Sequence, residues 1–222
     1  GIEAVLGTPG PDLRYLTGYH AHALERLTGL VIPAEGDVTL VVPELEVGTA
    51  NASPVADLPI SIATWQETDD PYALTASLLA RPGEGTRIAV EDRMWAVKAL
   101  ELRKAMPGAE QVGAGVVLGE LRMRKSQAEI EQLQRAGAAI DRVHAAVPGW
   151  LRAGRTENEV AQDIADAILN EHETADFVIV ASGPNGASPH HMASDRVIQP
   201  GDAVVVDIGG TTAAGYCSDS TR

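Results

Sequence analysis

The order of the apolar segments changes near residue 117, and this change limits the folds that the chain can adopt. Before it, short apolar runs alternate with stretches of helical character and with turn residues. Strands that alternate with helices are typical of an α/β layer domain. After it, two stretches of helical spacing come first and strands follow, which is an α+β order. The sequence therefore predicts two domains, residues 1–117 and 118–222.

The first domain is expected to contain a hairpin and two helices. The expected strands are 4–6, 30–32, 38–42 and 88–90, of which the middle two flank a turn segment and predict an antiparallel pair. A helix over 71–80 has a proline in its first turn and is expected to break at 81–83. A second helix over 94–106 is expected to end at the following Pro-Gly pair.

Two helices with the same N-terminal signal open the second domain. Ser126 with Glu129, and Thr156 with Glu159, have the spacing of a capping box. Apolar residues recur behind both boxes at spacings of three and four. Pro148 is expected to end the first helix. The strands expected to follow are 177–181, 203–206 and 216–218.

The charge and the cysteine content exclude several classes of partner. Lys and Arg total 17 against 31 for Asp and Glu, which gives a formal charge of −14. This balance argues against nucleic acid and against an anionic membrane surface. No apolar run approaches the length of a membrane span. Cys217 is the single cysteine, so no internal disulfide is possible, and we expect a reducing, cytoplasmic location.

Two aspartates near the end of the chain are candidates for a metal site. Asp207 follows four apolar residues, and Asp219 lies twelve residues further on. If the intervening turn centres near Ala213, the two residues face each other across an antiparallel pair, with Cβ atoms roughly 5 Å apart. Carboxylates this close repel unless cations neutralise them. Two divalent ions about 3.5–4 Å apart would fit between them. A simpler interpretation makes Asp207 a turn cap before Gly209 and Asp219 an ordinary N-cap or surface residue.

The surrounding residues favour the metal interpretation through a family resemblance. The segments Val204–Gly210 and Gly215–Arg222 resemble the first metal-ligand hairpin of the pita-bread metallopeptidases. That family contains prolidase, aminopeptidase P, methionine aminopeptidase and the metal-free creatinase. Ser182–His190 resembles the loop that carries the family's substrate-binding histidine, and Tyr15–Tyr19 resembles the N-terminal domain of the prolidase branch. The resemblance implies an α/β N-terminal domain followed by a partial α+β pita-bread catalytic domain.

By this resemblance, Asp207 and Asp219 are metal ligands, with Asp219 as the bridge between two divalent ions. Manganese is the expected metal, with cobalt or zinc as alternatives. His190 would hydrogen-bond the substrate near the scissile bond and help to hold the developing oxyanion. His191 is a candidate for the wall of the substrate pocket. The family's remaining ligands, one His and two Glu, would lie after Arg222, and both ends of the chain are expected to be cut points.

The implied reaction is hydrolysis of the peptide bond before a proline, in a dipeptide or at a peptide N-terminus. A metal-activated bridging water would attack the bond, and the resemblance also implies a homodimer. One alternative is a metal-free creatinase-like amidinohydrolase, against which the presence of both aspartates argues. Another is a catalytically inactive relative that serves as a binding or scaffold module. The residues after Arg222 would decide between that module and a peptidase.

Overall fold

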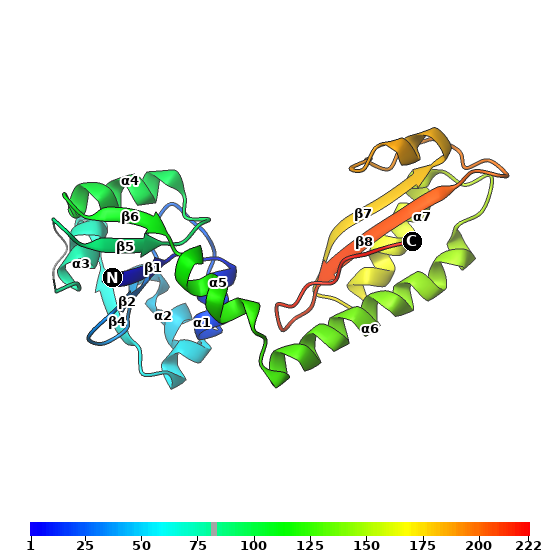
Figure 1. Cartoon of the computed structure of the whole chain (residues 1–222). Helices are drawn as coiled ribbons and strands as arrows, with labels where there is room; N and C mark the ends of the chain where they lie inside the picture. Colours follow the sequence, from blue (N-terminus) through cyan, green and yellow to red (C-terminus); the bar gives the residue numbers. More distant parts are fainter. Residues whose placement is uncertain (81–83) are drawn as a thin grey trace. The chain divides into compact units, whose positions relative to one another are not determined.

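The computed structural model describes residues 1–80 and 84–222, so the helix break expected at 81–83 lies outside the described residues. The chain forms two compact units, Gly1–Arg124 and Lys125–Arg222, both drawn in Figure 1. Each unit has its own sheet and its own helices. No helix in the described part of the chain combines the length and the apolar character needed to cross a bilayer.

A six-stranded mixed sheet forms the first unit, with the strand order β4-β3-β2-β1-β5-β6. The strands are β1 (Ala4–Gly7), β2 (Gly29–Pro33), β3 (Thr39–Pro43), β4 (Ser61–Trp65), β5 (Arg87–Val90) and β6 (Glu110–Gly113). β1 pairs with β2, and β2 with β3, in antiparallel register, which confirms the expected hairpin. The other three pairings are parallel, as expected for an α/β layer.

Helices cover both faces of this sheet. They are α1 (Pro11–Thr17), α2 (Val47–Asn51), α3 (Pro71–Ser77), α4 (Ala96–Ala105) and α5 (Gly115–Met123), with short 3₁₀ turns at Glu44–Glu46 and Pro54–Asp57. The expected domain boundary between residues 117 and 118 falls inside α5. Leu118 packs in one buried cluster with Val5 and Ala89 of the sheet, so α5 belongs to the first unit.

The second unit packs two helices against a three-stranded antiparallel sheet. The helices are α6 (Gln127–Trp150) and α7 (Glu157–Leu169), and the strands, in the order β7-β8-β9, are β7 (Thr174–Ser182), β8 (Val204–Thr211) and β9 (Ser220–Thr221). Figure 1 shows the two helices beside the long β7–β8 pair. Both expected capping boxes are formed, at Ser126 and at Thr156.

Several element boundaries differ from expectation, and two of these differences have a clear physical cause. Pro148 lies inside α6, because a proline in the last turn removes a single backbone donor and the bond from Leu151 N to Val147 O still closes the helix (2.9 Å). β8 continues beyond the expected end at Val206, through Gly209 and Gly210 to Thr211. A Cβ atom on Gly209 would lie 2.4 Å from the carbonyl of Ser218, so glycine here permits a close strand pairing.

Candidate metal-binding hairpin and substrate loop

Asp207 lies on the face of the sheet that points away from the helices. Its neighbours Val206 and Ile208 are buried in the core cluster that α6 and α7 form with the sheet. Successive side chains of a strand point to opposite faces, so the carboxylate between them faces the other side. Asp207 is therefore half-buried in the middle of β8, and not at the end of a buried strand as expected.

The hairpin turn fixes the register of the two aspartates. Asp207 pairs with Thr221, and Thr211 bridges to Cys217, so the turn centres on Ala214. The prediction of a turn centred on Ala213, with Asp207 directly opposite Asp219, is wrong by one residue. Gly215 closes the turn with φ of 86°, a backbone conformation that favours glycine, and its N–H donates to the carbonyl of Thr212 (2.7 Å).

Asp219 is nevertheless on the same face as Asp207. Pairs on both sides of Asp219 follow one register, so Asp219 lies diagonally across from Asp207. Diagonal neighbours of an antiparallel pair are about 7–8 Å apart between Cα atoms, and their side chains are closer. Thr221 Oγ1 donates to Asp207 Oδ1 (2.6 Å) and orients that carboxylate, whereas Asp219 is exposed.

Two histidines hold the hairpin from the opposite, helix-facing side. His144 Nε2 donates to the carbonyl of Ser220 (3.0 Å), which links α6 to β9. His172 Nε2 lies 2.9 Å from Ser218 Oγ, and both side chains are buried. Ser218 and Ser220 flank Asp219, so these contacts fix the backbone from which its carboxylate projects. His144 itself is half-buried.

The two carboxylates fit the ligand chemistry of hard or borderline divalent ions without completing a coordination shell. Carboxylate oxygens suit manganese, magnesium and zinc. Among residues 1–80 and 84–222, no group of three or more His, Cys, Asp or Glu side chains is placed to hold a metal ion. Asp207 and Asp219 thus form one side of a candidate site, and further ligands must come from elsewhere.

The two adjacent histidines of the loop after β7 differ in their surroundings. His190 is exposed and follows the short helix η3 (Gly183–Ala187). His191 is half-buried, and its Nε2 lies 2.7 Å from Glu157 Oε2. Because a carboxylate only accepts, His191 Nε2 donates this bond. The role of His190 at a substrate stays a prediction, and the side chain of His191 is directed to Glu157.

Glu157, in the first turn of α7, is fully buried and accepts hydrogen bonds from four residues of this loop. The donors are Ser182, Asn185, His191 and Ser194. Burial alone would raise the pKa of Glu157, but the bonds from Ser182, Ser194 and His191 outweigh it and hold the pKa well below its usual range. The buried carboxylate is therefore ionised.

A charged pair supports the same loop. The guanidinium of Arg196 donates to both carboxylate oxygens of Asp202 (2.6 and 3.2 Å) and to Ser182 Oγ (2.6 Å). The bond from Arg196 lowers the pKa of Asp202. Gly183, with φ of 51°, passes beside this pair, where a Cβ atom would lie 2.7 Å from Arg196 Nη2. Arg196 thus links Ser182, at the start of the loop, to Asp202, near its end.

Glu157 is the residue of this region that the sequence interpretation missed. In the sequence it stands inside the Thr-x-x-Glu box, whose N-cap is Thr156 and whose glutamate is Glu159, and the box alone gives Glu157 no role. A usable signal is present, because Glu157 lies three residues before Val160 and on the same helical face as Ile164 and Ile168. A glutamate on an apolar helix face must be paired or neutral, and this property distinguishes it from the exposed glutamates.

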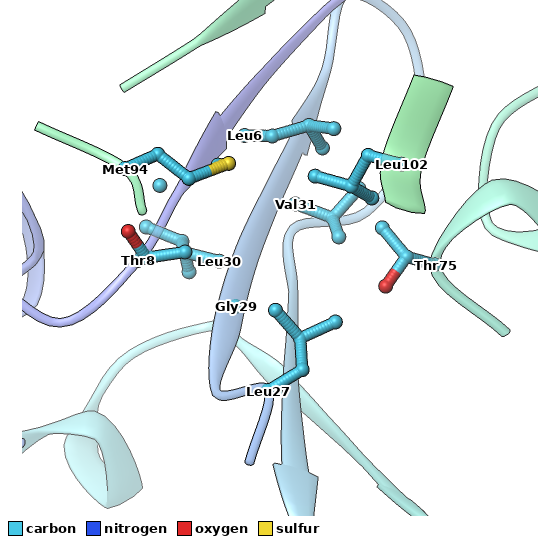
Figure 2. A pocket seen from close by; sticks show the side chains of 10 residues that line it. Leu6, Thr8, Leu27, Gly29, Leu30, Val31, Thr75, Met94 and Leu102 are labelled. Atoms are coloured by element: carbon cyan, nitrogen blue, oxygen red, sulfur yellow. The ribbon is translucent and has the colours of Figure 1, made fainter. Parts of the chain in front are cut away.

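A separate small cavity lies within the first unit. Figure 2 shows Leu6, Leu27, Val31 and Leu102 around it, with the hydroxyl of Thr8 at one side. The described residues that line it have aliphatic, thioether or hydroxyl side chains, or none. These residues therefore offer no carboxylate or imidazole that could bind a metal ion.

Each of the two units matches a known protein family. Residues 1–124 match the creatinase/prolidase N-terminal domain, and residues 131–222 match metallopeptidase family M24. A Mycobacterium tuberculosis protein described as probable dipeptidase PepE is 50% identical over 223 residues, which cover 100% of this chain and 59% of the relative. This chain thus spans about three fifths of the length of that relative.

Solved structures show the same relationship. Dipeptidase PepE from Mycobacterium ulcerans superposes with a TM-score of 0.93 at 52% identity, over 100% of this chain and 59% of that one. A recombinant prolidase from Thermococcus sibiricus gives a TM-score of 0.86 at 32% identity, over 100% and 60%. The expected fold class is confirmed. The chain belongs to the creatinase/prolidase family, with an N-terminal domain of that type followed by part of an M24 pita-bread domain.

Proposed function

We propose that the whole protein to which these residues belong is a metal-dependent peptidase that hydrolyses the bond before proline. The observation that carries the proposal is the placement of Asp207 and Asp219 on one face of the β8–β9 hairpin, with Asp207 oriented by Thr221. The relatives described as dipeptidase and prolidase support the choice of substrate class. The substrate is a dipeptide or the N-terminus of a longer peptide.

In this proposal Asp207 and Asp219 hold two divalent metal ions, manganese by preference. Metal ions bound there would supply Lewis acidity and lower the pKa of a water. The chain's own contribution is to fix the two carboxylates on a hairpin whose far side is held by His144 and His172. His190 would donate a hydrogen bond near the scissile carbonyl, where negative charge develops. We also propose that the whole protein is a homodimer in the cytoplasm.

An assay of the whole protein with added Mn²⁺ tests this function. The substrates are an Xaa-Pro dipeptide, the matched Xaa-Ala dipeptide, an Xaa-Pro-Xaa tripeptide and creatine. We expect cleavage before proline, loss of cleavage with a chelator and recovery when Mn²⁺ is restored. The dipeptide-to-tripeptide ratio then separates a dipeptidase from an aminopeptidase. Absence of peptide cleavage, or hydrolysis of creatine that survives the chelator, would refute the proposal.

A further inference from the structure

The carboxylate of Glu157 lies between the two arms of the loop that carries His190. One arm begins at Ser182, at the end of β7, and the other returns at Ser194 before β8. Ser182 and Asn185 precede His190 in the chain, whereas His191 and Ser194 follow it. All four donate to the one carboxylate, so a single side chain joins both arms.

The two carboxylate oxygens divide the donors between the arms. Oε1 accepts from the N–H and the hydroxyl of Ser182 (2.8 and 2.7 Å). Oε2 accepts from His191 Nε2 (2.7 Å) and from the hydroxyl and N–H of Ser194 (2.7 and 3.2 Å). Asn185 Nδ2 reaches both oxygens, at 3.0 and 3.2 Å. Hydrogen bonds to an ionised carboxylate are stronger than those between neutral groups, and they also fix the positions of the groups that they join.

The site requires a carboxylate and not merely a polar side chain. Every partner presents a donor, and an ionised carboxylate is acceptor-only with about four lone-pair positions. A glutamine at 157 would replace one acceptor by an NH₂ group that faces other donors. The residue also has a rigid support, because Val160, Ile164 and Ile168 of the same helix are fully buried.

We propose that Glu157 is a positioning residue of the peptidase site, which sets the place of His190 by joining the two arms of the 182–194 loop. His191 then acts in this network through its Nε2 donor and not as a wall of the substrate pocket. The inference rests on the proposed function. It assigns Glu157 no contact with the substrate and no proton transfer.

The test compares Glu157→Gln with Glu159→Gln in the whole, Mn²⁺-loaded protein. Glu159 is exposed on the same helix turn, and glutamine at that position still fits a capping box. We expect Glu157→Gln to lower kcat/KM for an Xaa-Pro dipeptide by up to about 100-fold, with metal content unchanged. The control should stay within about twofold of wild type. The ¹⁵N shift of His191 Nε2 should change in Glu157→Gln alone, and amide exchange across residues 183–194 should accelerate.

A double mutant shows whether the effect passes through His190. In the His190→Ala background, Glu157→Gln should cost no more than about twofold, because residues that act as a unit are not additive. An unchanged kcat/KM, or the same full loss in both backgrounds, overturns the inference. If Glu157→Gln does not fold, Ser194→Ala removes one donor and should show the same dependence on His190. Absence of all peptidase activity refutes the proposed function, while the shift and exchange data still decide whether Glu157 holds the loop.

Discussion

Glu157 combines two opposed effects in one side chain. Burial disfavours its charged form, and hydrogen bonds from Ser182, His191 and Ser194 favour it more strongly. A buried charge with this many partners is costly to disturb, because removing the carboxylate leaves buried donors without an acceptor. The residue therefore links the stability of the second unit to the geometry of its loop.

Glu157→Gln should lower the free energy of unfolding by about 2–3 kcal/mol at neutral pH, as for the loss of charge-assisted hydrogen bonds. The folded-state pKa is depressed, so this contribution is present above the unfolded pKa of about 4.3 and is lost as the pH falls toward the folded value. Urea unfolding at pH 7 and at pH 3 measures the effect. The gap between wild type and variant should narrow at pH 3, and an equal gap at both values would contradict the account.

A candidate functional residue could be predicted where the signal lies in the residues next to it in the sequence. Asp207 interrupts an apolar run, and that interruption is visible in the sequence. The partners of Glu157 are not, because Ser182 and Ser194 lie 25 and 37 residues away and meet it through tertiary packing. The metal roles of Asp207 and Asp219, and the substrate role of His190, stay predictions.

At the scale of elements, the β8–β9 hairpin depends on glycines that allow close packing. A Cβ atom on Gly210 would lie 2.5 Å from the carbonyl of Thr174 and 2.8 Å from Ile168 Cγ2. Thr174 belongs to the neighbouring strand β7, and Ile168 belongs to α7, which covers the core side of the sheet. The strand therefore accepts two glycines in succession although glycine is a poor strand former.

Gly210→Ala should destabilise the protein by about 1–3 kcal/mol, because the added methyl group meets backbone and a packed side chain. Gly137→Ala is the matched control on α6. Nothing lies within 4 Å of a Cβ atom there, so alanine should stabilise by roughly 0.5–1 kcal/mol through helix propensity. Thermal or urea unfolding measures both changes. Changes of the same sign in the two variants would contradict this interpretation.

The sequence predicted elements better than it predicted their register. Capping boxes at Ser126 and Thr156 begin both helices as expected, because the cap is a local interaction. The hairpin register was wrong by one residue, since it depends on where Gly215 closes the turn. A shift of the turn centre by one residue moves the pairing by two, and so Asp219 keeps its face but not its direct opposition to Asp207.

At the scale of the whole molecule, each buried apolar cluster of the described residues lies within one unit. The clusters of the first unit contain residues from Ile2 to Leu118, and the cluster of the second contains residues from Ile140 to Ile208. Each unit thus has the core that an independent domain requires. The sequence indicated two domains through its change of element order. The expected boundary nevertheless fell inside α5, because the residues that pack against this helix are remote in the chain and local pattern does not reveal them.

Residues 1–124 expressed alone should therefore fold and unfold in one cooperative transition. The sheet, the helices and the apolar clusters of the first unit all lie within that segment. Far-UV circular dichroism during urea unfolding provides the measurement, with the whole protein as control. A gradual, non-cooperative loss of signal would show that the first unit depends on the rest of the protein.

The metal content of the whole protein tests the central claim most directly. Purified wild type should bind two Mn²⁺ ions per chain, as a two-metal site requires. Asp207→Asn and Asp219→Asn should lose metal and Xaa-Pro hydrolysis together. Asp166→Asn, an exposed helix residue given the same change, should retain both. Full metal loading and turnover in Asp207→Asn would contradict the assignment of the hairpin as a metal site.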